Sequence, residues 1–121
     1  MVAAVISLLS LSRPVQHHWW LAAGGSPHQL ADLLGTPLRR TGAPATSLRE
    51  LLLVFAPLPA LEAATANPAS RQARFRYLIC FHRAGPRLSC WRRRPDGIGW
   101  QRRCGPMPLA GFVARFRAAP A

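Results

Sequence analysis

The chain has no lysine and few acidic residues, and these two absences restrict what kind of protein it can be. All 16 of its basic side chains are arginines, and with four acids the formal net charge of the 121 residues is +12. An average soluble domain is about 25% charged, with both signs mixed. Here 17% of the residues are charged, nearly all with one sign. Because such a charge distribution repels itself, the composition favours a polyanionic partner that neutralises it.

The scarcity of acids also argues against catalysis by paired carboxylates. The acids are Asp32, Glu50, Glu62 and Asp96. Only Glu50 and Glu62 share a segment, and at about 3.6 residues per helical turn they lie too far apart to act together. Nothing else in the chain has the spacing of a catalytic or cofactor-binding motif. We therefore expect a protein that is not an enzyme, that uses no cofactor and for which no small-molecule substrate is inferred.

Cysteine is also scarce, because the chain has only Cys80, Cys90 and Cys104. Three cysteines are too few for a disulfide scaffold, and an odd number leaves one unpaired. Together with His82 they include the ligand types that zinc prefers, but the spacing lacks the paired knuckles of known zinc sites, so no metal is expected. If the first hairpin pairs symmetrically about Gly85, Cys80 faces Cys90. Buried free thiols or one Cys80–Cys90 disulfide are then the expected states.

No apolar run is long enough to span a bilayer. Val2–Leu11 is uncharged, but runs of about 10–14 apolar residues are typical of core helices or of the central part of a signal peptide. No basic residue precedes the run, which disfavours a signal peptide. We expect a short apolar helix that ends at Arg13, since the residue before Pro14 avoids the helical region.

Start and stop signals predict further helices in the N-terminal half. Ser26 and Gln29 form a capping box, and Gly35 supplies a C-terminal stop. A second capping box at Ser47–Glu50 precedes Leu51–Phe55, which is apolar on every side and is therefore expected to be buried or membrane-bound. Residues 60–70 have the composition of a small-residue linker.

The second half has the alternation and turns of a sheet. The pattern predicts strands over residues 74–81, 88–94 and 98–104, turns at 84–86 and 95–97, and a basic amphipathic helix over 108–118. The expected fold is thus one α+β domain over residues 1–121. In it an apolar, near-neutral helical half (1–64) packs on a three-stranded antiparallel β-meander within the basic half (65–121), followed by the short C-terminal amphipathic helix.

The positive charge lies almost entirely in that second half. Residues 65–121 hold twelve arginines against Asp96 alone, an asymmetry that indicates nucleic acid or an anionic membrane. Guanidinium groups pair with phosphates, and aromatic rings stack on bases. The candidate nucleic-acid-binding residues are Arg74, Arg76, Arg83, Arg87, Trp91, Arg92, Arg93, Arg94, Trp100, Arg102 and Arg103, and Phe75 and Tyr77 are expected to stack or pack beside them. In the alternative interpretation the aromatic residues form the core and the arginines a solvated face, as strand alternation predicts for Phe75, Tyr77, Ile79 and Phe81. The leading hypothesis is a non-enzymatic binder of RNA or single-stranded nucleic acid.

Two alternatives remain open. In the first, Val2–Leu11, Leu51–Phe55 and the helix 108–118 place apolar faces on a membrane while the arginines contact its anionic headgroups. In the second, the arginines reflect a GC-rich reading frame, since arginine without lysine beside abundant alanine, proline and glycine is typical of such frames. A poorly selected frame of this kind would have no defined biochemical function and no cooperative thermal unfolding.

One segment resembles part of a known family. Residues 92–100, which read Arg-Arg-Arg-Pro-Asp-Gly-Ile-Gly-Trp after two expected strands, resemble the strand-and-loop start of nudix-type domains. Those enzymes bind metal through a glutamate cluster, whereas no glutamate follows Glu62 in this chain. The resemblance therefore implies a shared hairpin pattern and no activity.

Overall fold

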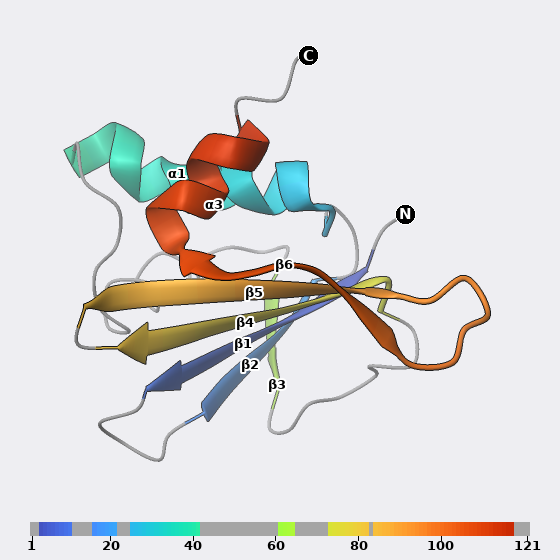
Figure 1. Ribbon diagram of the computed structural model, residues 1–121. Helices are drawn as coiled ribbons and strands as arrows, with labels where there is room; N and C mark the ends of the chain where they lie inside the picture. Colours follow the sequence, from blue (N-terminus) through green and yellow to red (C-terminus); the bar gives the residue numbers. More distant parts are fainter. Residues whose placement is uncertain are drawn as a thin grey trace.

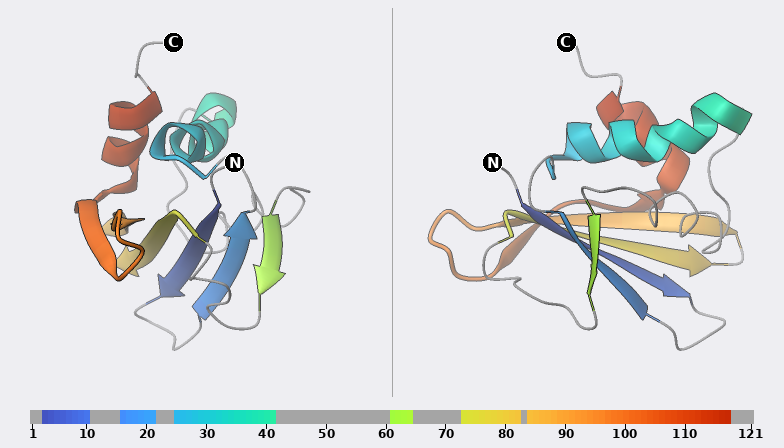
Figure 2. Two further views of the ribbon diagram at one scale, coloured as in Figure 1. Left: turned by 90° about the vertical axis from the view of Figure 1, so that its right-hand side faces the viewer. Right: turned by 180° about the vertical axis from the view of Figure 1, so that it is seen from behind.

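The structure is a computed structural model that describes residues 3–10, 16–21, 25–41, 61–64, 73–82 and 84–117. These residues form a six-stranded sheet with two helices, α1 and α3, on one of its faces (Figures 1 and 2). The elements are β1 (Ala4–Ser10), β2 (Gln16–Leu21), α1 (Pro27–Thr41), β3 (Leu61–Ala64), β4 (Phe75–His82), β5 (Gly85–Arg93), β6 (Trp100–Pro108) and α3 (Leu109–Arg117).

The strand order β3-β2-β1-β4-β5-β6 shows that the expected α+β arrangement is wrong. The described chain is mostly β, and its N-terminal half contributes three strands and α1 instead of an all-helical layer. The sheet is mixed, because β1 runs parallel to β4 while the other neighbouring strands are antiparallel. The expected meander exists as β4, β5 and β6, but it is only half of a larger sheet.

The main error concerns Val2–Leu11, which was expected to be a helix, whereas the described residues Ala4–Ser10 within it form the inner strand β1. Ala4, Ile6 and Leu8 belong to the core under the helices, and Val5 and Ser7 on the other face are buried as well. A strand buried on both faces has a continuous apolar sequence without alternation. Periodicity cannot distinguish such a run from a buried helix.

Two further strands lie where no strand was expected. Residues 16–21 form β2, which pairs with β1 and places Trp19 and Leu21 in the core. Leu61–Ala64, part of the expected linker, forms the edge strand β3 beside β2. Its sequence, Leu-Glu-Ala-Ala, consists of good helix formers. Pairing with a neighbouring strand, a tertiary effect, therefore determines its conformation.

The first capping box is confirmed. The backbone N–H of Ser26 donates to Gln29 Oε1 at 3.2 Å, and the N–H of Gln29 donates to Ser26 Oγ at 3.4 Å. The stop expected at Gly35 is wrong, since α1 continues to Thr41. A Cβ atom at Gly35 would lie 3.2 Å from Cδ of Arg117, so glycine lets the Arg117 side chain of α3 lie close to α1. The second capping box and Leu51–Phe55 lie outside the described residues.

The C-terminal helix is present as α3, and its apolar side closes the core. Leu109, Phe112, Val113 and Phe116 are buried against the sheet and α1. Phe112 meets Tyr77 of β4 edge to face, with ring centroids 6.2 Å apart. Within the part of the chain that the structure describes, no helix is long and apolar enough to cross a membrane.

Candidate nucleic-acid interface

The alternation of side chains in β4 and β5 divides the arginine-rich half into two different faces. Tyr77 and Ile79 of β4, with Leu88 and Cys90 of β5, point toward the helices and are fully buried. The intervening residues point the other way, to the side on which neither described helix lies (Figure 2). We call this side the helix-free face.

Five side chains on the helix-free face form a layer of alternating cations and indoles, which we call the Arg–Trp ladder. Its members are Arg76 of β4, Trp91 and Arg93 of β5, and Trp100 and Arg102 of β6. Strand register brings them together, because Trp91 is paired with Arg76 on one side and with Arg102 on the other, and Arg93 is paired with Trp100.

The contacts within the ladder are cation–π contacts. The guanidinium carbons of Arg76 and Arg102 lie 5.9 Å and 5.6 Å from the Trp91 ring, and that of Arg93 lies 4.6 Å from Trp100. Both indoles are partly exposed and Arg102 is exposed. The indoles therefore hold the guanidinium planes at the surface, where their remaining N–H groups can reach a ligand.

A β-bulge in β6 makes this arrangement possible. Arg102 and Cys104 are two residues apart and would share a face in a regular strand. The register between β5 and β6 shifts between Cys90 and Trp91, so Arg102 joins Trp91 outside while Cys104 joins Cys90 inside. Arg103 is the extra residue that the bulge accommodates.

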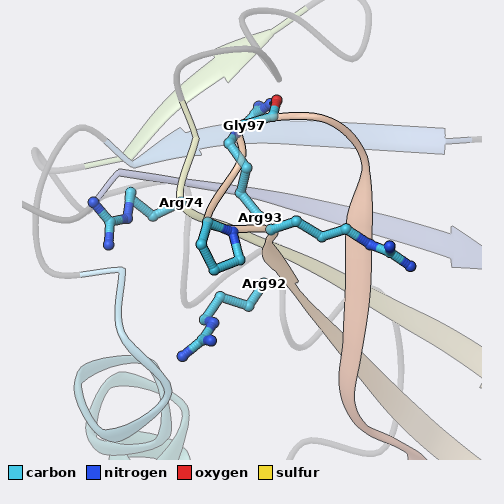
Figure 3. A pocket seen from close by; sticks show the side chains of 6 residues that line it. Arg74, Arg92, Arg93 and Gly97 are labelled. Atoms are coloured by element: carbon cyan, nitrogen blue, oxygen red, sulfur yellow. The ribbon is translucent and has the colours of Figure 1, made fainter.

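A second cluster of arginines surrounds an open hollow of about 330 Å³ at the end of the sheet, lined by Arg74, Arg92, Arg93, Arg94, Pro95 and Gly97. Arg74 precedes β4, Arg92 and Arg93 end β5, and the other residues belong to the following turn. Figure 3 shows the side chains of Arg74 and Arg92 extending to the same side of this hollow. Guanidinium groups in such an arrangement suit a phosphate, which accepts several hydrogen bonds.

The turn beside the hollow has the expected chemistry. The N–H of Gly97 donates to the Arg94 carbonyl at 2.8 Å, and the N–H of Ile98 donates to Asp96 Oδ1 at 2.8 Å. Arg93 connects the turn with the residues before β4. Its Nη1 donates to the Gly97 carbonyl at 3.4 Å, and its Nε donates to the Ala73 carbonyl at 2.8 Å. The sequence contains no signal for this bond, because its acceptor is a backbone atom 20 residues away.

The structure separates the sequence-derived candidates into four groups. The helix-free face carries Arg76, Arg87, Trp91, Arg93, Trp100 and Arg102. The hollow is lined by Arg74, Arg92 and Arg94, together with Arg93. Arg103 is exposed at the bulge, and Arg83 lies outside the described residues. Tyr77 packs in the core, as strand alternation predicts, since it is fully buried and its hydroxyl donates to the Gly25 carbonyl at 2.6 Å. Phe75 stacks on Tyr77 at 6.1 Å, on the helix-covered face.

The cysteines are placed differently from the expectation. Cys90 faces Cys104, whereas Cys80 faces Arg87 across the first hairpin. The hairpin pairs His82 with Gly85, so its centre lies before Gly85, and Cys80 points to the opposite side of the sheet from Cys90. Among the described residues no group of three potential ligands could hold a metal ion.

Burial disfavours the thiolate form of all three cysteines. Burial raises the pKa of Cys90 to about 12 and also raises the pKa values of Cys80 and Cys104. Nearby arginines act in the opposite direction, because a positive charge favours the thiolate. Arg103 and Arg115 do oppose the rise at Cys104, but desolvation is the larger effect.

Comparison with known proteins identifies no relative. No protein-family model, no curated protein and no solved structure matches the chain. The geometry of the helix-free face and of the hollow is therefore the basis for a functional assignment.

Proposed function

We propose that the protein is a non-enzymatic binder of single-stranded nucleic acid and that the Arg–Trp ladder is its contact surface. The observation that carries this proposal is the position of Trp91 between two guanidinium groups on a partly exposed face. Bases stack both on indoles and on guanidinium planes. The same guanidinium groups pair with the phosphates between successive bases. One surface thus offers both interactions that single strands require.

The charge distribution supports the same conclusion. Asp96 is the only acid in residues 73–117. Its Oδ1 accepts the hydrogen bond from Ile98 within the turn, where it stabilises the hairpin. The ladder and the hollow therefore carry positive charge with little internal neutralisation, and each phosphate that binds releases counterions. Arg74 and Arg92 at the hollow extend this charge beyond the ladder.

The membrane alternative receives less support from the geometry. Of the three apolar segments that it requires, Val2–Leu11 contributes the buried strand β1, and the apolar side of α3 packs on the sheet and α1. Both surfaces are occupied within the fold, so neither is available to lipid. Leu51–Phe55 lies outside the described residues. We therefore do not propose a membrane function.

The experiment compares two arginines that sit over aromatic rings on opposite sides of the molecule. Arg102 lies 5.6 Å from Trp91 in the ladder, and Arg115 of α3 lies 5.1 Å from Phe116. Both are exposed, and replacing either by glutamine removes one positive charge. Binding of a fluorescein-labelled single strand of about 12 nucleotides, the size of a common single-strand site, is measured by anisotropy at several salt concentrations.

We expect Arg102→Gln to weaken binding about five-fold at 0.1 M salt and to reduce the salt slope by about 0.7, the value for one phosphate of a single strand. Trp91→Leu should cost about 1–3 kcal/mol through lost stacking, with an unchanged salt slope. Arg115→Gln should behave nearly as wild type. Equal losses for Arg102→Gln and Arg115→Gln would mean that only net charge matters and would contradict the proposal.

Circular dichroism of the same samples tests the remaining alternative. A cooperative thermal transition that oligonucleotide raises at low salt is expected for a folded binder, since a ligand that binds only the folded chain stabilises it. A featureless melt in every condition would favour a frame without defined function. Both the proposed binding of nucleic acid and the expected effects of core substitutions on stability would then be wrong.

A further inference from the structure

The clearest unused feature of the structure is a pair of buried thiols in direct opposition. Cys90 of β5 and Cys104 of β6 are register partners in antiparallel strands, and both are free. Both belong to the buried cluster on the helix-covered face, where Cys90 is fully buried and Cys104 is 8% exposed. Two side chains that start opposite each other and enter the same space must lie close together.

The backbone geometry suits a covalent bond between them. Cys90 and Cys104 are Cα partners between two shifts of register. Directly opposite residues of a regular antiparallel pair have Cα atoms about 4.5–5.5 Å apart. Disulfides join residues whose Cα atoms are about 4.4–6.8 Å apart. Each thiol also influences the pKa of the other, as expected of neighbouring groups. Neither strand therefore has to move far for the sulfur atoms to bond.

We propose that Cys90 and Cys104 are an oxidative modification site, at which a small disulfide such as oxidised glutathione converts the two thiols into a cross-strand disulfide. Cys80 is excluded from this reaction because it faces Arg87 on the other side of the sheet. The site does not depend on nucleic-acid binding, since the ladder lies on the opposite face.

The reaction balances as two exchange steps. The Cys104 thiolate attacks one sulfur of the oxidised glutathione, whose S–S bond breaks and releases one glutathione thiolate. The Cys90 thiolate then attacks the Cys104 sulfur of the mixed disulfide and expels the second glutathione. The two cysteines lose two protons and two electrons, and the disulfide reagent becomes two glutathione thiols.

Cys104 reacts first because of its position. It lies in β6, the last strand in the sheet order, whereas Cys90 lies in β5, which is paired on both sides. Edge strands open locally at lower free energy than inner strands, so the reagent reaches Cys104 without global unfolding. Burial also keeps both thiols largely protonated, which makes the reaction slow at neutral pH.

The test uses the full chain under folding conditions with oxidised glutathione, followed by alkylation of the remaining thiols. Trypsin places the three cysteines on separate peptides, residues 77–83, 88–92 and 104–115. We expect the last two peptides to be joined and the first to be alkylated on Cys80. In denaturant the loop between Cys80 and Cys90 closes more readily than the longer loop between Cys90 and Cys104. The fraction of Cys80–Cys90 disulfide should therefore increase there. Such an increase would show that the native strand register selects the Cys90–Cys104 bond.

Two matched variants and a melt complete the test. Cys80→Ala should form the same disulfide as the wild type, and Cys104→Ser should form none with Cys90. The oxidised wild type should melt on the order of 10 °C above the reduced form, and a reductant should reverse this shift. Three results would each overturn the proposal. The first is a disulfide that involves Cys80 in the folded chain, and the second is a persistent glutathione adduct at Cys104. The third is a folded chain whose thiols are all still alkylated at a time when the denatured chain has already oxidised.

Discussion

The two faces of strands β4, β5 and β6 differ completely although they alternate residue by residue along the same chain. Toward the helices lie Tyr77, Ile79, Leu88 and Cys90, all fully buried. Away from the helices lies the Arg–Trp ladder, with two partly exposed indoles among three arginines. The contrast shows how a chain with a charge of +12 can still fold. Period-two alternation places Arg76, Arg87, Arg93 and Arg102 on one side of these strands, and the other side forms a core.

The aromatic residues divide between the faces in the same way. Tyr77 and Phe112 meet edge to face inside the core, and their expected contribution is to the free energy of unfolding. Trp91 and Trp100 lie under guanidinium groups outside, and their expected contribution is to binding. Variants on the two faces should therefore affect different measurements.

The largest effect is expected at the centre of the helix-covered face. Phe112→Ala removes a fully buried ring from α3 and should lower the free energy of unfolding by about 3–5 kcal/mol, because it leaves a cavity. Ile98→Ala is the control, since Ile98 is 76% exposed and its truncation should change stability by less than about 0.5 kcal/mol. Urea unfolding followed by circular dichroism measures both, and equal values would disprove the assignment of the core.

The next effect concerns the irregular part of β6 that separates the faces. Gly105 has φ +90°, and a Cβ atom there would collide with the Leu88 carbonyl oxygen. Gly105→Ala should therefore cost on the order of 3 kcal/mol. Gly97 has a similar φ of +79° but open space around it, so Gly97→Ala should cost about 1–2 kcal/mol. If the two variants lose the same stability, the close approach of β5 and β6 at Gly105 is wrong.

A smaller effect should appear as the pH rises. Burial raises the pKa of Cys90 to about 12, whereas an unfolded thiol titrates near about 8.5. The folded chain thus holds this proton more tightly, and the resulting stability, complete below about pH 8.5, is lost progressively as the pH rises toward 12. We expect the free energy of unfolding to fall by up to about 1.4 kcal/mol per pH unit between about pH 9 and pH 10. Cys90→Ala should flatten part of this slope, and an unchanged slope would show that Cys90 is not the cause.

The smallest effects are expected on the helix-free face, where one residue departs from the pattern. Arg76→Gln should change stability by no more than about 0.5–1 kcal/mol, the value of an exposed cation–π contact. Arg93 also belongs to the ladder, but it holds the Ala73 carbonyl at 2.8 Å, so Arg93→Gln should cost about 1.5–3 kcal/mol. The control is the affinity of Arg76→Gln for the oligonucleotide. This affinity should fall although the free energy of unfolding changes little. A large loss of stability for Arg76→Gln would remove the distinction between the faces.

The sequence predicted the local features of this fold well and the long-range ones poorly. The capping box at Ser26, the turn at Pro95–Gly97, the three strands of the basic half and the amphipathic α3 are confirmed. Each depends on residues close together in the chain. Within the helix expected at Val2–Leu11, Ala4–Ser10 instead form a strand, because they pair with β4, which follows more than 60 residues later. No local pattern distinguishes the two conformations in such a run.

The candidate site follows the same division. Composition alone indicated the arginines and tryptophans of residues 73–104, since a charge of one sign beside aromatic residues suits a polyanion. Strand alternation placed Tyr77 in the expected core, but it did not show that Trp91 lies between Arg76 and Arg102, because that position depends on how β5 pairs with both of its neighbours. Register resolves this, since a shift by one residue would exchange the faces.

The sequence by itself therefore determined the charge, its concentration in the second half and the local starts and turns of the elements. Only the tertiary structure decided that β1 joins the sheet, that the bulge in β6 sends Arg102 outward and Cys104 inward, and that Cys90 meets Cys104 and not Cys80. The physical reason is that propensities and caps act over a few residues. Strand pairing and burial instead depend on partners that are distant in the chain and become neighbours only when the core forms.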